Sequence, residues 1–243
     1  MTDRLLDRQS RLLDYLTSGA AIFDSSGDPA REPVLSGIDR GLLRLEARYS
    51  HEKRMAKIEW VLNRTLSLLG SNRSLIVRDF AEVCPPMSAE RLENARQFYD
   101  FLSARWQSQS PEPPYLPDIA LFELTYAAVR GGAMRNPAPA TGSCLRPGSI
   151  RRHPNVTLIH CAYDIRPALE GIAETAPVRS DTRFAITLLS GVAEPVVCAL
   201  SCELFAALEM FDEFVDPDAF QDMPGADDLI ASLTAGGFLE VSR

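Results

Sequence analysis

The stretch that decides the fold is RRHPNVTLIHCAYDI, residues 151–165, where the spacing of the apolar residues changes. Upstream of it, apolar residues recur three or four positions apart, which is the spacing of a helix face. Within it, Ile159 and Cys161 alternate with Leu158 and His160, which is the two-residue period of a strand. We therefore expect an α+β protein in which a helical region precedes a region with a sheet.

Two histidines, a cysteine and an aspartate in this stretch raise the question of a metal or catalytic site. His160 and Cys161 are adjacent, so in a strand their side chains point to opposite faces. A zinc site needs converging ligands, and no second cluster of Cys or His has ligand spacing. We expect no metal in this chain, and we interpret His160 as a partly buried, hydrogen-bonded residue.

Downstream of the deciding stretch, the pattern predicts a small domain over residues 155–243. Two further strands are expected in TRFAITLLS (182–190) and PVVCALS (195–201). Ser201 is placed to cap a helix that begins at residue 202, and a second helix and a short strand close the chain. Three strands followed by helices and a last strand predict a winged-helix-like domain.

Upstream, the sequence predicts a helical domain over residues 1–130 and a connector over 131–154. The helices are expected at 2–18, 41–70, 74–83, 89–106 and 115–130. The longest carries an apolar stripe, and it is formed by Met55, Ile58, Leu62, Leu66 and Leu69. Glu123 is an acidic residue among apolar neighbours on the helix expected at 115–130. The connector is rich in Gly and Pro and contains arginines but no acid.

Charge divides the chain in the same way. The net charge is −8, but the first 154 residues carry 21 basic and 18 acidic groups, whereas the rest carries four arginines and 15 acids. Contacts with phosphates dominate the affinity of proteins for nucleic acids. The strongly acidic region after residue 154 therefore argues against DNA binding. No stretch is long and uncharged enough to span a membrane, and no secretory signal is visible, so we expect a cytoplasmic protein.

The five cysteines show no CxxC spacing and are expected to be reduced thiols. Cys144, in the basic connector, is the one thiol in a setting that favours the thiolate. A thiol enzyme that uses Cys144 is therefore one alternative function. A transcription regulator with an acidic C-terminal effector module is another.

The segments YLPDIALFELTYAAVR (115–130) and LRPGSIRRHPNVTLIHCAYDI (145–165) resemble the MbnC- and TglI-like partner subunits of the multinuclear non-haem iron oxidases. The resemblance covers about residues 85–243 and is somewhat greater to the TglI-like branch. The matching positions lie on the helix and at the opening of the strand, and they are Leu116, Asp118, Ala120, Glu123, His153, Pro154 and Val156.

The resemblance implies a non-catalytic subunit with a domain like the recognition elements of ribosomal-peptide modification enzymes. It would bind the leader of a ribosomally made precursor peptide and present the peptide's cysteine to a TIM-barrel oxidase. That oxidase would hold the iron, and this chain would hold no cofactor. The product would be a natural product of the 3-thiaglutamate or methanobactin type.

In such a domain we expect the peptide to add to the strand that leads into the first helix. The predicted contact residues are Pro195, Val196, Val197, Cys198 and Ala199 on that strand and Leu229, Ile230 and Leu233 on the last helix. A proline at Val197 should then disturb peptide binding. Leu233 is more compatible with a role in the core. The residues expected to dock the oxidase are Arg146, Arg151, Arg152 and Glu123.

Overall fold

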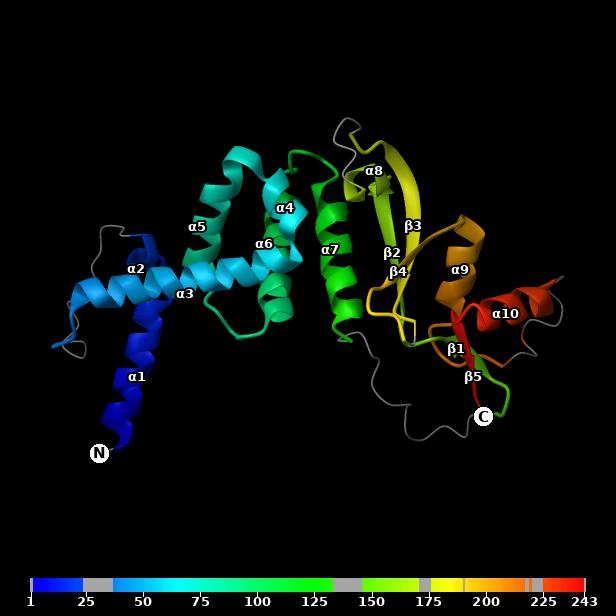
Figure 1. Ribbon diagram of the computed structural model, residues 1–243, viewed down its shortest axis with the longest axis horizontal. Coiled ribbons are helices and arrows are strands. Elements are labelled where there is room, and N and C mark those ends of the chain that lie inside the picture. Colours follow the sequence, from blue (N-terminus) through cyan, green and yellow to red (C-terminus); the bar gives the residue numbers. More distant parts are fainter. Residues whose placement is uncertain are drawn as a thin grey trace. The chain divides into compact units, whose positions relative to one another are not determined.

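The computed structural model describes residues 2–23, 37–132, 146–170, 176–189, 191–216, 219 and 225–242 (Figure 1). The chain divides into two compact units, Met1–Leu124 and Thr125–Arg243. The described part of unit 1 is helical, and the antiparallel sheets lie in unit 2, so the protein is a mixed α+β protein as expected. The division falls within helix α7 (Leu116–Arg130), upstream of the boundary at residue 130 that the sequence suggested.

Unit 1 contains the helices that the sequence predicted, with one interruption. The elements are α1 (Thr2–Leu16), α2 (Gly19–Phe23), α3 (Arg40–Val61), α4 (Asn63–Leu68), the 3-10 turn η3 (Gly70–Asn72), α5 (Arg73–Val83), α6 (Arg91–Ser108) and the start of α7. The prediction of a single helix over 41–70 is therefore wrong. The first helix of this stretch, α3, ends at Val61, and Leu62, at φ −111° and ψ 46°, separates α3 from α4.

The predicted apolar stripe lies in the core of unit 1. Ile58, Leu62 and Leu66 are fully buried, and Leu69 is nearly so. Beside them the rings of Phe80 and Phe98 meet edge to face, with centroids 4.9 Å apart. Burial of each of these large side chains contributes roughly 1.5–3 kcal/mol to folding.

Unit 2 contains a three-stranded antiparallel sheet in the order β2-β3-β4. The strands are β2 (Val156–Tyr163), β3 (Arg179–Thr187) and β4 (Val196–Leu200), close to the three predicted strands. A short helix, α8 (Arg166–Leu169), follows β2. Ile159 lies opposite Phe184, and Leu158 lies opposite Ala185. Since partners in an antiparallel pair share a face, Leu158 and His160 point to one side of the sheet and Ile159 and Cys161 to the other.

A second sheet pairs β1 (Ile150–Arg152) with β5 (Leu239–Val241), so a strand lies inside the stretch predicted as a connector. Helices α9 (Cys202–Met210) and α10 (Ala226–Ala235) complete unit 2, and Figure 1 shows α9 next to the three-stranded sheet. Ser201 caps α9 as predicted, because its side chain accepts a hydrogen bond from the backbone N–H of Leu204 at 3.2 Å.

The core of unit 2 connects its two sheets to its helices. The buried residues Ile150 and Leu239, from β1 and β5, pack with Leu208 of α9 and Leu233 of α10. Leu158 and Leu200, from the edge strands β2 and β4, pack against this cluster. Among the described residues, no helix is long and apolar enough to cross a membrane.

Candidate functional site

A groove of about 640 Å³ lies between strand β2 and helix α9 in unit 2. One wall is the chain from the end of β1 into β2, with Arg152, Pro154 and Thr157. The opposite wall is α9 and the residues after it, with Phe205, Glu209 and Asp212. Both walls belong to unit 2, so the groove is a feature of that unit alone.

Strand β2 is an edge of the three-stranded sheet, because among the described strands it pairs only with β3. In an antiparallel ladder, alternate residues direct their N–H and C=O groups away from the partner strand. An edge strand therefore presents a row of backbone donors and acceptors. The groove lies next to this strand, and an extended peptide can add to such a free sheet edge.

The local sequence explains why a groove forms here. Val156, Leu158 and His160 lie on the sheet face that packs toward α9, but Val156 is buried whereas His160 is exposed. The partial burial that the sequence suggested for His160 is therefore wrong, because its side chain is 54% exposed. The ring of His160 lies 6.4 Å from that of Phe205, centroid to centroid. The side chains of β2 that line the groove are thus apolar near Val156 and polar near His160.

Charged side chains of both signs surround the groove. Arg152 donates to the carbonyl of Leu208 at 3.1 Å and pairs with Asp212, which anchors it at the end of α9. His160 and Arg183 both contact Asp181, the latter at 2.6 Å. These two hydrogen-bonding partners, His160 first, lower the pKa of the Asp181 carboxyl below its usual range. The groove is therefore bordered by both anionic and cationic groups.

The residues predicted to bind a peptide on β4 lie at the opposite edge of the same sheet. Strand β4 also pairs only with β3 among the described strands. Val197 is 38% exposed and Ala199 is exposed, while Val196 and Cys198 are partly buried and Pro195 is buried. Peptide binding at β4 stays a prediction.

The helix predicted to flank β4 contributes mainly to the core. Leu233 is 6% exposed and belongs to the core cluster of unit 2, and Ile230 packs against that cluster. Leu229, at 38% exposure, is the most accessible of the three. The burial of Leu233 thus agrees with the core role that the sequence favoured.

The three arginines predicted to dock an oxidase each form an ion pair within unit 2. Arg146 pairs with Asp216 at 2.6 Å, Arg151 pairs with Glu240, and Arg152 pairs with Asp212. The side chain of Arg146 is 66% exposed, but those of Arg151 and Arg152 are only 20% and 18% exposed. Of the three, Arg146 offers the most surface to a partner, and docking by all of them stays a prediction.

Glu123, the fourth predicted docking residue, caps a helix in unit 1. Its carboxylate accepts hydrogen bonds from the backbone N–H groups of Arg64 and Thr65, at 2.8 and 3.0 Å, and from the Thr65 hydroxyl at 2.7 Å. These donors lie at the start of α4, where backbone N–H groups have no intrahelical partner. Burial nevertheless raises the pKa of Glu123, against the opposing effect of these hydrogen bonds.

The cysteines and histidines do not converge in the part of the chain that the structure describes. There, no three side chains of the His, Cys, Asp and Glu types are grouped so that they could hold a metal ion. Cys161 is buried, and the Nδ1 atom of His153 accepts a hydrogen bond from the backbone N–H of Asn155 at 3.1 Å. Cys144, the candidate thiol, lies outside the described residues.

Sequence reasoning missed the groove beside β2. The one signal in the sequence was His160, a polar residue on a strand face that otherwise carries Val156 and Leu158. Which helix would lie over that face could not be read from the strand pattern. The comparisons with known proteins add no assignment, since no family model and no curated protein matches the chain.

Proposed function

We propose that this protein is a non-catalytic partner subunit that binds the leader of a ribosomally made precursor peptide. It presents the peptide's cysteine to an iron-dependent TIM-barrel oxidase, which holds the metal. Unit 2 acts as a winged-helix-like recognition domain, and unit 1 docks the oxidase together with Arg146, Arg151 and Arg152 of unit 2. The resemblance of residues 115–130 and 145–165 to the partner subunits of multinuclear iron oxidases motivates the proposal.

The groove between β2 and α9 is the observation that best supports peptide binding. A volume of about 640 Å³ next to an edge strand fits a segment of several residues in extended conformation. Backbone hydrogen bonds to β2 supply affinity, and side-chain pockets against α9 supply specificity. We therefore place the leader beside β2, and β4 is the alternative edge.

The test is peptide binding by variants that block one edge at a time. Short peptides encoded next to the gene are labelled, and their affinity for the full chain is measured by fluorescence polarisation. His160→Trp places a bulky side chain on the groove face of β2, and Ala199→Trp places the same side chain on β4. Circular dichroism confirms that both variants stay folded.

We expect His160→Trp to weaken peptide binding by at least about tenfold, whereas Ala199→Trp leaves it nearly unchanged. Glu209→Lys, in the groove, should also weaken binding, and Glu213→Lys, an exposed acid that does not line it, serves as the matched control. The reverse pattern would move the peptide to β4. No binding of any encoded peptide by the wild-type chain would refute peptide recognition.

A further inference from the structure

Helix α3 carries apolar side chains on two faces, and only one of these faces is buried in unit 1. The buried face includes Leu43, Ala47 and Ile58. The other, which we call the outer face of α3, is formed by Leu42, Leu45, Tyr49, Ala56 and Trp60. We propose that the outer face pairs, antiparallel, with the outer face of a second copy of this chain. The inference goes beyond the proposed function and does not depend on it.

The residues of the outer face have the spacing of a helix that pairs with another helix. Leu42, Tyr49 and Ala56 are seven residues apart, Leu45 follows Leu42 by three residues, and Trp60 follows Ala56 by four. Residues at these spacings lie on one side of a helix. From Leu42 to Trp60 the face is about 27 Å long, which is enough for contacts over several turns.

The four large side chains of the outer face are all more than half exposed. The exposed fractions are 64% for Leu42, 64% for Leu45, 51% for Tyr49 and 52% for Trp60. A single exposed apolar residue is ordinary on a protein surface, but a row of them along one helix makes a contiguous patch. Patches of this kind mark interaction sites, and aromatic residues are enriched in them.

The charges beside the outer face favour a second copy as the molecule that covers it. Glu46 and Lys53 are exposed and seven residues apart, so they lie along the same border of the face. Neither forms an ion pair with a residue that the structure describes. The Nζ atom of Lys53 lies 3.9 Å from the centroid of the Tyr49 ring, which keeps this cation next to the outer face. A border with one acid and one base is complementary to itself when the second helix runs in the opposite direction.

These two charges also set the register of the pair. When Glu46 lies beside Lys53 of the second copy, twofold symmetry places Lys53 beside Glu46 of the second copy, so two ion pairs form. The same register places Leu45 opposite Ala56 of the second copy. A large apolar side chain then meets a small one, which lets the two helices approach closely.

A parallel pair of outer faces would not bring opposite charges together. The border of the outer face opposite to that of Glu46 and Lys53 carries Arg48. In a parallel pair of helices, side chains of opposite borders meet when they are five residues apart, so Arg48 would face Lys53 of the second copy. Two cations would then meet on each side of the pair, which favours the antiparallel arrangement.

The mixture of charges also distinguishes a second copy from other large partners. A membrane surface or a nucleic acid is bound by surfaces with an excess of Lys and Arg. The outer face is instead bordered by both signs, with Glu46 and Glu52 as well as Arg48 and Lys53. A partner that carries both signs in the complementary order therefore fits this face, and an identical helix is such a partner.

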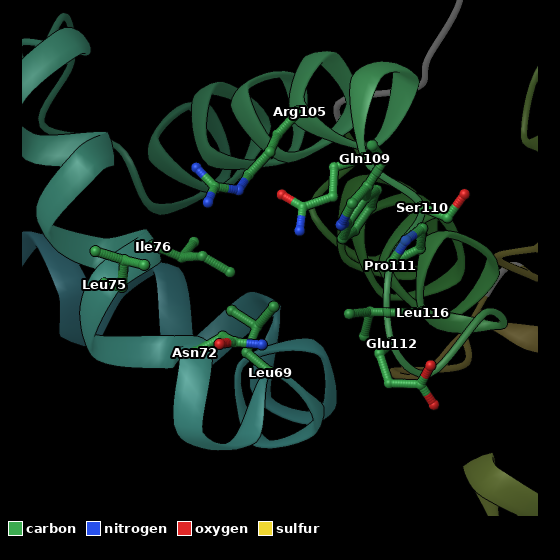
Figure 2. A pocket seen from close by; sticks show the side chains of 11 residues that line it. Leu69, Asn72, Leu75, Ile76, Arg105, Gln109, Ser110, Pro111, Glu112 and Leu116 are labelled. Carbon is green, nitrogen blue, oxygen red and sulfur yellow. The ribbon is translucent and has the colours of Figure 1, made fainter.

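The outer face is separate from the hollow part of the surface of unit 1. A pocket of about 170 Å³ lies between the end of α6 and the η3–α5 region (Figure 2). None of the side chains that line this pocket comes from α3. Leu75, which lines it and is 54% exposed, is therefore an accessible leucine away from the outer face and serves as a matched control.

Sedimentation equilibrium of the full chain over a concentration series tests the self-association. We expect the apparent mass to rise from that of one chain toward that of two, with a dissociation constant in the micromolar range, because one pair of helices buries less area than a standard interface. Leu45→Glu should abolish the dimer, since it places a charge in the apolar contact. Leu75→Glu should leave the dimer unchanged. Circular dichroism checks that both variants stay folded.

Charge exchange tests the antiparallel register. Glu46→Lys and Lys53→Glu should each raise the dissociation constant roughly tenfold, because each change turns both ion pairs into contacts between like charges. An equimolar mixture of these two variants should associate like the wild type, since each then meets the opposite charge again. Asp100→Lys, at an exposed acid of α6, is the control and should leave the dissociation constant unchanged.

Three results would overturn the inference. They are a chain that stays monomeric throughout the concentration series, a dimer that Leu45→Glu does not weaken, and a mixture of the two charge variants that does not regain the affinity of the wild type. The second result would assign the dimer to another surface, and the third would exclude the antiparallel register. None of these results bears on leader binding, which is measured at the groove of unit 2.

Discussion

Arg54 shows how single residues hold unit 1 together. The residue is 7% exposed, and its guanidinium donates to Asn94 at 3.1 Å, to the carbonyl of Cys84 at 2.7 Å and to Gln97 at 2.6 Å. It also lies over the ring of Phe80 at 4.3 Å. Burial lowers its pKa to about 10, so it stays charged at neutral pH.

Arg54→Lys should lower the free energy of unfolding by about 2–3 kcal/mol, since an ammonium cannot reproduce the planar fork and leaves buried acceptors unpaired. Chemical denaturation followed by circular dichroism measures this. Arg64→Lys, at a half-buried position outside this network, is the control and should change stability much less. Equal stability of Arg54→Lys and the wild type would mean that the network adds nothing to folding.

His51 makes the stability of unit 1 depend on pH. It is 9% exposed and meets the ring of Phe23 edge to face, with centroids 5.4 Å apart. Burial, and then the charge of Arg54, lower its pKa, so the folded protein binds its proton less tightly than the unfolded chain does. The stability that His51 contributes is therefore present above its unfolded pKa of about 6.5 and is lost as pH falls toward the folded value.

His51→Phe removes this titration and keeps a ring of similar size against Phe23. We expect the melting temperature of the variant to fall less between pH 7.5 and pH 5 than that of the wild type. Thermal unfolding at a series of pH values checks this. Parallel curves for the two proteins would show that another group sets the acid sensitivity.

At the level of elements, the existence of the helices could be predicted, but the interruption between α3 and α4 could not. The spacing of Ile58, Leu62 and Leu66 predicted a buried stripe, and these residues are buried. The break at Leu62 has no local signal such as proline or glycine. It coincides with the contact of the α4 N-terminus with Glu123, which is 59 residues from Arg64 in the sequence. The spacing of apolar residues within one segment gives no information about a contact with a residue so distant in the sequence.

The same limit applies to unit 2. The three strands and the Ser201 cap follow from alternation and local hydrogen bonding, so they were predictable. Strand β1 was missed, because its three residues, Ile150–Arg152, are too short for a pattern and are defined by pairing with β5. The groove beside β2 depends on where α9 packs, which is again set by contacts distant in sequence.

Helix α7 provides a test at the scale of an element. Phe122, on this helix, is 8% exposed. Phe122→Ala should cost about 3–5 kcal/mol, because it removes buried area and leaves a cavity. Denaturant unfolding measures the loss. A variant of unchanged stability that fails to bind the oxidase would place Phe122 at an interface instead.

At the scale of the whole molecule, the difference in net charge between residues 1–154 and the rest of the chain matters for the proposed assembly with a partner. Arg146, whose side chain is 66% exposed, is the predicted docking arginine with the most accessible surface. Its pair with Asp216 is exposed, so reversing its charge costs only about 0–1 kcal/mol of stability. We expect Arg146→Glu to slow association with the proposed oxidase partner, most clearly at low salt.

Arg166→Glu is the matched control, because Arg166 is 55% exposed and also pairs with an acid of unit 2, Asp164 at 2.6 Å. Association rates measured over a salt series distinguish the two arginines. Equal effects of the two reversals would attribute the slowing to net charge rather than to docking at Arg146.

The central claim is that the chain binds a peptide for a partner that carries out the chemistry. The decisive measurement is co-expression with a TIM-barrel iron oxidase of the proposed kind, followed by size-exclusion chromatography and iron analysis of the complex and of the chain alone. We expect a stoichiometric complex that contains iron, and a chain that is free of iron when purified by itself. Stoichiometric iron in the isolated chain, or no complex with the oxidase, would contradict it.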